Sequence, residues 1–587
     1  MAGLGNAGIG RHLLVRLTSR VFIKLTRSGG RTYAQLAESF RDEQGRPRQR
    51  TLATLGRIDD NGGQVDKLLA ALLRARGRPA GDAAAPQVRF ESALALGDVW
   101  ALSELWRELG FDGLGAVFRR TRHTTPVEHA LRAMVFNRLC DPDSKLGVLR
   151  WLQTVSLPGV DAAALTHQQL LRSMDALMNH QAAVEACVAQ LLRPLIDDEL
   201  SVVFYDLTTI RTEGTSEQSG DVRRHGLSKD GGIARQFMLG VVQTADGLPI
   251  HHEVFAGNTA EAPTLEPMLK SVLSRFAHIR RLVVVADRGL LSLDNLEQLA
   301  ALRVGEGGAP LEFILAVPGR RYGEFQEILG PLRQGIEQAA AQDAEFVGEV
   351  RWQGHRLVVA HDPARAREQT RERQDRIEAL EKQGKQWADK LDAQDAGEVH
   401  RGRKLTDGGA RARFFHAVAD AQLSRIVKVD LQGELFNFEV DPLALARAEA
   451  MDGKLLLVSN VQDLDQKQIV QRYKALADIE RGFRVLKSEI EIAPVFHRLP
   501  ERIKAHAALC FMALVVYRVM RQRLRLAGSR LSPEAALAEL RRIQHHRIAI
   551  NETTPVTGVS TIHQQQAEVL AALKVAKPPQ DAQMSLL

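Results

Sequence analysis

The sequence predicts an α/β protein whose core is a mixed β-sheet interrupted by a long insertion. Between residues 200 and 318, runs rich in β-branched and aromatic residues alternate with stretches of helical periodicity. Their expected order, β-β-β-α-β-α-β, places antiparallel strands before α/β crossovers. A strongly amphipathic helical stretch follows only after residue 460. We therefore expect the core at 200–318 and 461–550, with a β-rich insertion at 319–460.

Composition indicates a multi-domain globular protein. The chain has 587 residues, of which 45% are apolar and 25% charged, with a net charge of +7. This mild positive charge suits a polyanionic partner without requiring one. The three cysteines lie far apart and lack His or Cys neighbours at ligand spacing, which excludes a disulfide framework or a cysteine-based zinc site.

Nothing in the sequence predicts secretion or membrane insertion. The longest apolar candidate, Ala505–Tyr517, is shorter than the roughly 18 residues of a membrane span. The N-terminal stretch lacks an apolar segment followed by a small-residue cleavage site. We expect a cytoplasmic protein that makes no contact with membranes.

Three regions are expected before the core. Residues 1–20 are Gly-rich and are expected to be a disordered extension, and 21–77 are expected to form a small β unit. A basic turn near Arg46 fits either a phosphate contact or a solvated loop. After a Gly/Ala/Pro-rich linker, residues 92–199 show helical patterns throughout. Their basic side chains fit a DNA-binding domain or an ordinary surface.

Two acids follow apolar runs in the expected core. The run from 201 ends at Asp206, and the apolar strand 281–286 ends at Asp287. If the first and fourth strands pair in parallel, both acids reach the same edge of the sheet, where open α/β sheets carry their sites. The other expected elements are strands at 235–243, 248–255 and 313–318, a hairpin turn at Asp246-Gly247, and helices at 262–276 and 292–303.

The insertion and the C-terminal region are less regular. Strands are expected at 346–360, 414–418, 424–430 and 435–440. A highly charged helical stretch at 363–392 is expected to be an exposed arm or a paired hairpin, and a solvated helix is favoured over a DNA contact. The apolar helix at 501–525 is expected to be buried beside the sheet. Residues 551–587 are expected to be a tail.

The stretch 473–487 predicts a single amphipathic helix. An apolar stripe recurs at steps of three and four residues, at Leu476, Ile479, Phe483, Leu486 and Ile490. Tyr473, Glu480 and Lys487 stand seven apart on a neighbouring line. Alone, this pattern also fits an ordinary surface helix. Two acids at strand ends make Glu480 the expected third acid of a site.

The sheet order, with Asp206, Asp287 and Glu480, resembles the catalytic core of the DDE transposases of bacterial insertion sequences, which have an RNase H-like fold. The chain is similar to the subgroup with a β-rich insertion and a Tyr-x2-Arg-x3-Glu-x6-Lys signature. Tyr473, Glu480 and Lys487 match it, whereas Leu476 stands at the Arg position. The resemblance covers roughly residues 20 to 550. It rests on five sequence blocks: YDLTT (205–209), HGLSKD (225–230), GLPIHHEVFAGNTAE (247–261), VVVADRGL (283–290) and HRLPERIKAHAALCF (497–511).

The resemblance implies metal-dependent DNA strand cleavage and strand transfer at the ends of an insertion sequence. Two Mg²⁺ ions, with Mn²⁺ as a substitute, would be held by Asp206, Asp287 and Glu480, and Mg²⁺ prefers such carboxylate oxygens. Water, and then the freed 3′ hydroxyl, would attack phosphorus. The partners would be double-stranded DNA, as terminal inverted repeats and target, and a second copy of the chain. The expected DNA contacts are Tyr473, Lys487, Arg484, Arg288, Lys229 and Arg224.

Two other functions compete. One is a catalytically inactive or domesticated DNA-binding protein of the same fold, for which Leu476 is the only hint in the motif. The other is a phosphatase with Asp206 as nucleophile. That class requires a second Asp two residues later, where Thr208 stands, so it is disfavoured.

Overall fold

The structure is a computed structural model, and it describes residues 21–28, 31–42, 46–57, 88–119, 121, 126–196, 201–229, 231–290, 293–305, 308–397, 405–550 and 555–579. The chain divides into two compact units. The smaller comprises residues 1–93, 546–558 and 581–587, and the larger comprises 94–545 and 559–580. The expected disordered extension at 1–20 lies outside the described residues.

The smaller unit contains the β structure expected from residue 21. Strands β1 (Val21–Ser28), β2 (Arg31–Arg41) and β3 (Pro47–Arg57) form an antiparallel sheet. Residues 58–77 of the expected unit are not among those described. Two arginines of the basic turn are paired, since Arg48 lies 3.2 Å from Asp42 and Arg50 lies 2.7 Å from Glu38. Most of a second sheet, of β4 (Val88–Ala95), β18 (Gln544–Ile550) and β19 (Val556–Val559), also belongs to this unit.

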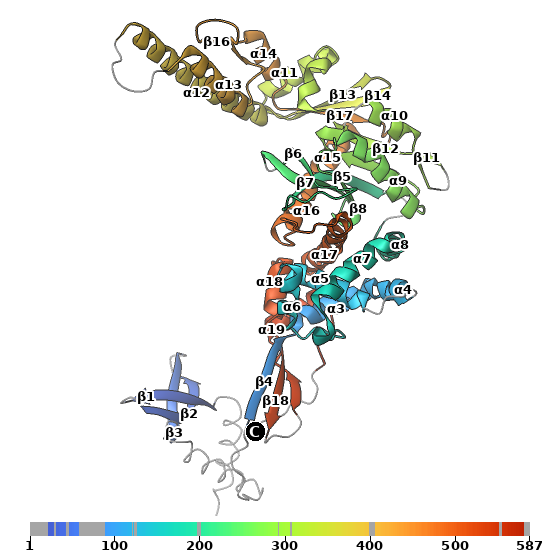
Figure 1. Ribbon diagram of the computed structural model, residues 1–587, viewed down its shortest axis with the longest axis vertical. Coiled ribbons are helices and arrows are strands. Elements are labelled where there is room, and N and C mark those ends of the chain that lie inside the picture. Colours follow the sequence, from blue (N-terminus) through green and yellow to red (C-terminus); the bar gives the residue numbers. More distant parts are fainter. Residues whose placement is uncertain are drawn as a thin grey trace, which may run out of the picture. The chain divides into compact units, whose positions relative to one another are not determined.

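The larger unit begins with the expected helices (Figure 1). One continuous apolar core joins them to the sheet and to the C-terminal helices, from Val99 to Val575. The helical region is therefore not a separate hydrophobic unit. Its helices are α3 (Gly97–Glu108), α4 (Leu114–Arg119), α5 (Val127–Cys140), α6 (Lys145–Leu152), α7 (His167–Asn179) and α8 (Gln181–Leu192).

The central sheet has the predicted mixed topology. Its strands lie in the order β13-β14-β17-β12-β9-β5-β7-β6, with β8 also paired to β7. β5 pairs in parallel with β9, and β9 with β12, whereas β7 is antiparallel to β5. This is the arrangement expected of an RNase H-like core. The bounds are β5 (Ser201–Arg211), β6 (Arg224–Leu227), β7 (Ile233–Thr244), β8 (Pro249–Ala256), α9 (Leu265–Arg275), β9 (Leu282–Ala286), α10 (Leu293–Ala301) and β12 (Glu312–Ala316).

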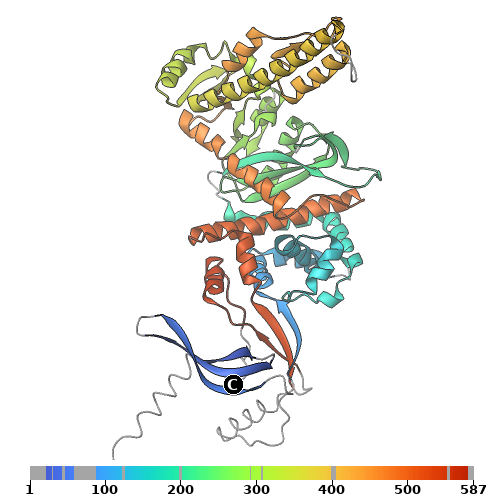
Figure 2. The same cartoon turned by 90° about the vertical axis from the view of Figure 1, so that its left-hand side faces the viewer.

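Helix α17 (Pro500–Leu526) lies between the sheet and the helical region (Figure 2). It is long and apolar enough to cross a membrane by length and composition, with a mean hydropathy of 1.6 over its most apolar window. However, 89% of that window is buried inside the protein. Its apolar surface is used in packing against α5, α7 and β8.

The expected insertion contributes strands to the central sheet. β13 (Phe346–Trp352), β14 (His355–His361) and β17 (Lys454–Ser459) extend its edge beyond β12. The part with its own apolar cluster is smaller, and contains α12 (Pro363–Asp395), α13 (Asp407–Asp420), β15 (Val427–Val429), β16 (Phe438–Val440) and α14 (Pro442–Glu449). The strand expected at 414–418 is wrong, because Ala410, Phe414 and Val418 recur every four residues and bury one face of α13.

The expected C-terminal tail also contains ordered structure. Helix α19 (Gln564–Ala572) packs against α17 and α18 (Pro533–Leu540), and the indole nitrogen of Trp100 donates to the carbonyl of Ala576 at 2.8 Å. Val569 and Leu570 are buried in the main core. The remaining short elements are β10 (Arg303–Val304), β11 (Ala309–Pro310) and α11 (Arg333–Ala341).

Candidate active site

Strand pairing brings the first two predicted acids together. Tyr205 of β5 lies opposite Ala286 of β9 in the parallel register, so Asp206 and Asp287 are the next residues on adjacent strands. The predicted parallel pairing is thus confirmed. Asp206 does not end its strand, however, because β5 continues to Arg211 through its pairing with β7. β9 ends at Ala286, just before Asp287, whereas Asp206 lies in the middle of β5 and remains within the sheet.

The surroundings of Asp206 disfavour its charge. Burial is the largest cause that raises its pKa, to about 6, and the negative charge of Asp287 adds to it. Lys229 and the backbone N–H of Leu207, which donates to Asp206 at 2.7 Å, act in the opposite direction. Two carboxylates held together in a partly buried place need a cation between them.

Lys229 is the cation that the described residues supply. Its Nζ lies 3.4 Å from Asp206 and 3.2 Å from Glu261, and it donates to the carbonyl of Leu207 at 2.5 Å. Burial opposes the charge of this lysine, but the two carboxylates outweigh burial and raise its pKa. Lys229 was predicted as a DNA contact, and here its ammonium group occupies the acidic site.

Glu261 is a fourth acid that the sequence analysis did not assign. It follows β8 and lies against Gly289, where an added Cβ would come within 1.9 Å of its Oε2. The carboxylate of Glu261 therefore lies directly against the backbone that follows Asp287 and Arg288. The only signal in the sequence was the position of Glu261 at the end of the GLPIHHEVFAGNTAE block.

Tyr473 and Arg288 lie beside Asp287. The phenol of Tyr473 donates to Asp287 Oδ1 at 2.9 Å, and its pKa is raised, first by burial and then by Asp287. The Arg288 side chain also hydrogen-bonds to Tyr473. Both residues were predicted as DNA contacts, and the structure places them beside Asp287, where the Tyr473 phenol holds one carboxylate oxygen.

The predicted single helix at 473–487 is two helices. α15 (Gln466–Lys474) carries Tyr473, and α16 (Ala477–Ser488) carries Glu480, Arg484 and Lys487. The apolar stripe is divided between two faces of the sheet. Leu476 packs with the α15 side, in the cluster that contains Val202 and Phe204 of β5, whereas Phe483 and Leu486 join the main core. The break between the two helices lies at 475–476.

Position 476, where the signature has Arg, is a packing position here. Leu476 is buried between α15 and the sheet, so it has no surface for DNA. α16 approaches the sheet closely at Gly482, where a Cβ would lie 2.7 Å from Gln243 Nε2 and 2.9 Å from an Arg518 nitrogen. The backbone of α16 thus carries Glu480 beside β5, although the side chain of Glu480 is not among those described.

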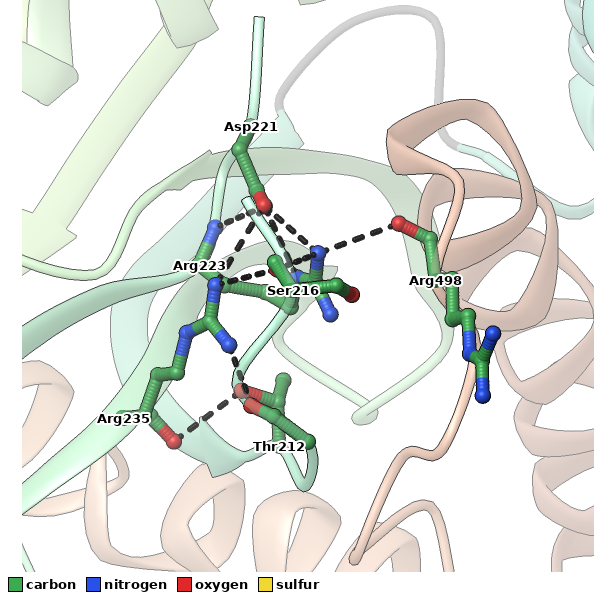
Figure 3. Close-up of polar contacts among 7 residues, drawn as sticks. Thr212, Ser216, Asp221, Arg223, Arg235 and Arg498 are labelled. Carbon is green, nitrogen blue, oxygen red and sulfur yellow. Dashed lines mark hydrogen bonds and ion pairs between the residues drawn. The ribbon is translucent and has the colours of Figure 1, made fainter. Parts of the chain in front are cut away.

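The remaining predicted contacts lie at the surface. Arg224, at the start of β6, and Arg484, on α16, are exposed, and Lys487 is in the last turn of α16. Arg223, the neighbour of Arg224, is instead fully buried and paired with Asp221 (Figure 3). Arg223 therefore forms a buried ion pair, whereas its neighbour Arg224 faces solvent.

The donor chemistry fits a hard divalent cation. No three His, Cys, Asp or Glu residues converge as a complete metal site among the side chains that the structure describes. Asp206 and Asp287 supply adjacent carboxylates, and the pKa of Asp206 is raised chiefly by burial and to a smaller extent by Asp287. Oxygen-only donors suit Mg²⁺ or Mn²⁺ and not zinc. Paired acids on adjacent parallel strands of a mixed sheet define a metal-dependent nucleic-acid enzyme of RNase H-like fold.

Comparison with protein families agrees with this class. The family model described as "Transposase DDE domain" matches residues 197–516, which is more than half of the chain. A second, described as "IS1634 family transposase, N-terminal domain", matches residues 23–85. No curated protein matches the chain. The chain belongs to the DDE transposases of insertion sequences, which bind DNA and depend on a divalent metal.

Proposed function

We propose that Asp206, Asp287 and Glu480 hold two Mg²⁺ ions, with Mn²⁺ as a substitute, at the catalytic centre of this transposase. The observation that carries the proposal is the parallel register of β5 and β9, which makes the two aspartates neighbours. The position of Glu480 on α16, packed against β5, supports its role as the third ligand. The substrates are the terminal inverted repeats of the element and its target DNA.

Bound divalent ions supply positive charge that activates an oxygen nucleophile and stabilises the leaving oxygen of the phosphodiester. The protein provides the geometry. Tyr473 fixes Asp287 by its hydrogen bond, and the backbone N–H of Leu207 fixes one oxygen of Asp206. Lys229 partly neutralises Asp206 and is also paired with Glu261, which would keep the ammonium group beside the site if Asp206 bound a cation. At neutral pH a carboxyl with a pKa of about 6 is largely ionised and able to bind a cation.

DNA contacts follow from the same placement. Arg224 and Arg484 are exposed and suit phosphate contacts, as does Lys487. Arg288 and Tyr473 orient Asp287 and also contact the DNA backbone. Two element ends are held together by two copies of the chain, and the enzyme acts in the cytoplasm. An inactive protein of the same fold is not favoured, because both described acids are in register.

Replacing Asp206 with Ala tests the proposal. Cleavage of a labelled DNA duplex that contains the element end, in Mg²⁺ or Mn²⁺, should fall to background. The Glu480→Gln variant should also lose cleavage while still binding DNA, and Glu489→Gln, at the C-terminal end of α16, is its control. Undiminished cleavage by Asp206→Ala would refute the assignment. If Glu489 proved essential and Glu480 dispensable, another residue would be the third ligand.

A further inference from the structure

A second polar cavity lies in the larger unit, away from the acids. Its volume is about 630 Å³, and it opens between the helical region, the segment 491–499 that links α16 to α17, and the first turns of α17. Basic side chains line both walls. Arg138, Lys145 and His167 come from α5, α6 and α7, and His497, Arg498 and Arg502 come from the facing side. The cavity thus collects basic side chains from two distant parts of the sequence, of which the His497 ring is neutral at pH 7.

Two of these cations are buried without a carboxylate partner. Arg138 and Lys145 are each only 6% exposed. The guanidinium of Arg138 donates to the backbone carbonyls of Asp143, Glu491 (3.1 Å) and Ile490 (3.4 Å). Lys145 makes neither a hydrogen bond nor an ion pair with any residue that the structure describes. Buried charges in folded proteins are normally paired, because an unpaired one costs several kcal/mol of desolvation.

The acids near the cavity are paired or exposed. Asp143 is paired with Arg150 at 2.9 Å, and Asp175 with Arg502 at 2.7 Å. Glu491 also lines the cavity; its side chain is exposed, and Arg138 contacts its backbone carbonyl. The basic groups in the cavity disfavour one another's charge, although burial has the larger effect. Burial and then Arg138 lower the pKa of Lys145 to about 7, and burial and then Lys145 lower the pKa of His497 to about 3. An anion that entered the cavity would satisfy charges that the protein leaves unpaired.

The rim of the cavity presents apolar surface. Phe496 is 71% exposed, and Leu146, across the opening, is 54% exposed. A basic groove beside an exposed aromatic ring is the arrangement by which proteins bind single-stranded nucleic acid, with the phosphate on the cations and the base stacked on the ring. The polyanion that this protein binds is DNA.

The cavity wall is tied to the catalytic sheet. Val495 forms a bridge with Thr212, just beyond the end of β5, and the Arg498 carbonyl accepts from the buried Arg223 at 3.1 Å (Figure 3). Arg223 is in turn held by Asp221 and by the Ser216 carbonyl at 2.7 Å. The wall therefore has a fixed position relative to the strand that carries Asp206.

We propose that this cavity binds a phosphate group of a DNA strand, paired with Lys145 and Arg138, while the ring of Phe496 stacks on an adjacent unpaired base. Because DNA binding can be measured without divalent ions, the proposal is independent of the acids at the catalytic centre.

Lys145→Met separates a binding role from a structural one. The substitution removes an unpaired buried charge and keeps the volume, so the melting temperature should rise. The affinity for a DNA end with a single-stranded extension, measured by fluorescence anisotropy in EDTA, should fall about tenfold. The slope of log affinity against log salt concentration should decrease by the amount expected for about one phosphate contact. Lys270→Met is the matched control, because Lys270 forms an exposed pair with Glu266 on α9. It should change neither property.

Opposite results would overturn the proposal. A lower melting temperature with unchanged DNA affinity in Lys145→Met would make the lysine a structural residue. If inorganic phosphate stabilised the wild type and not Lys145→Met, while DNA affinity was equal in both, the cavity would hold a free anion and not DNA. Phe496→Ala should weaken binding of the single-stranded extension more than of blunt duplex, and equal effects would refute base stacking.

Discussion

Asp221 and Asp206 are both paired with a cation in the larger unit, but their surroundings impose opposite preferences. The Asp221–Arg223 pair is fully buried, with the two side chains 2.6 Å apart and further hydrogen bonds to main-chain groups (Figure 3). Although burial opposes it, Arg223 lowers the pKa of Asp221. Burial raises the pKa of Asp206, and Asp287 adds to the shift, because the single lysine beside it does not outweigh them. The acid with full compensation supports the fold, whereas the acid with partial compensation lies in the candidate site.

Removing Asp221 should give the largest loss of stability. Asp221→Ala leaves Arg223 buried without its counter-charge, which should cost about 3–5 kcal/mol in the free energy of unfolding. The measurement is chemical denaturation at pH 7. Glu337→Ala, which breaks an exposed pair with Arg333 on α11, is the control and should change stability by less than about 0.5 kcal/mol. Equal effects in the two variants would show that the buried pair contributes nothing beyond a surface pair.

Removing the charge of Asp206 should increase the free energy of unfolding, opposite to the effect of removing Asp221. A carboxyl whose pKa rises from 3.8 unfolded to about 6 folded costs stability once it ionises. In EDTA, Asp206→Asn should therefore be more stable than wild type above pH 6, by up to about 3 kcal/mol. The gain should shrink as pH falls and vanish below about pH 4. Denaturation at pH 8 and pH 4 tests this, and a destabilised variant at pH 8 would contradict it.

A smaller effect is expected for the hydroxyl of Tyr473. Tyr473→Phe removes its hydrogen bond to Asp287 and should cost about 0.5–1.5 kcal/mol of stability. Since groups that orient a metal ligand tune affinity, binding of Mn²⁺ measured by calorimetry should weaken about 10–100-fold. Tyr322→Phe, which loses a 3.3 Å hydrogen bond to the Lys454 carbonyl, is the control. Unchanged Mn²⁺ affinity in Tyr473→Phe would remove the tyrosine from the site.

Gly289→Ala should have the smallest effect. The new methyl group would meet the flexible end of Glu261, which can move away, so stability should fall by less than about 1 kcal/mol. The displaced carboxylate would leave Lys229 with Asp206 alone, and cleavage should change only a few-fold. Gly319→Ala, where no atom lies within 4 Å of an added Cβ, is the control. Complete loss of cleavage in Gly289→Ala would give Glu261 a direct catalytic role.

Local sequence patterns predicted the sheet and its two aspartates. The fully apolar run before Asp287 predicts a strand buried on both faces, and such strands pair in parallel. The turn at Asp246-Gly247 is also present, with Gly247 at a φ of 78°. These features depend on residues close together in the chain, so a single sequence is sufficient to predict them.

One error was local, since the four-residue period of Ala410, Phe414 and Val418 indicates the helix at 414–418. The other errors concern contacts between distant segments. The break at 475–476 depends on which face of the sheet each apolar residue packs against, and a helical period does not record that choice. The strand β17 lies in the expected insertion but pairs with β12. The pairing of Lys229 with Glu261 likewise joins residues that no local pattern connects. The positions of Glu480, Arg484 and Lys487 relative to DNA remain predictions.

The shared core around α17 has a consequence for biosynthesis. Helices α3 to α8 are complete by residue 192, but α17, which buries their apolar faces, begins at Pro500, about 300 residues later. At roughly 5–20 residues per second, the ribosome takes about 15–60 s to deliver it. During that interval the nascent helices expose surface that only the C-terminal part can cover. Truncated chains that end before α17 should therefore aggregate or be degraded, and the enzyme becomes stable only when synthesis is nearly finished.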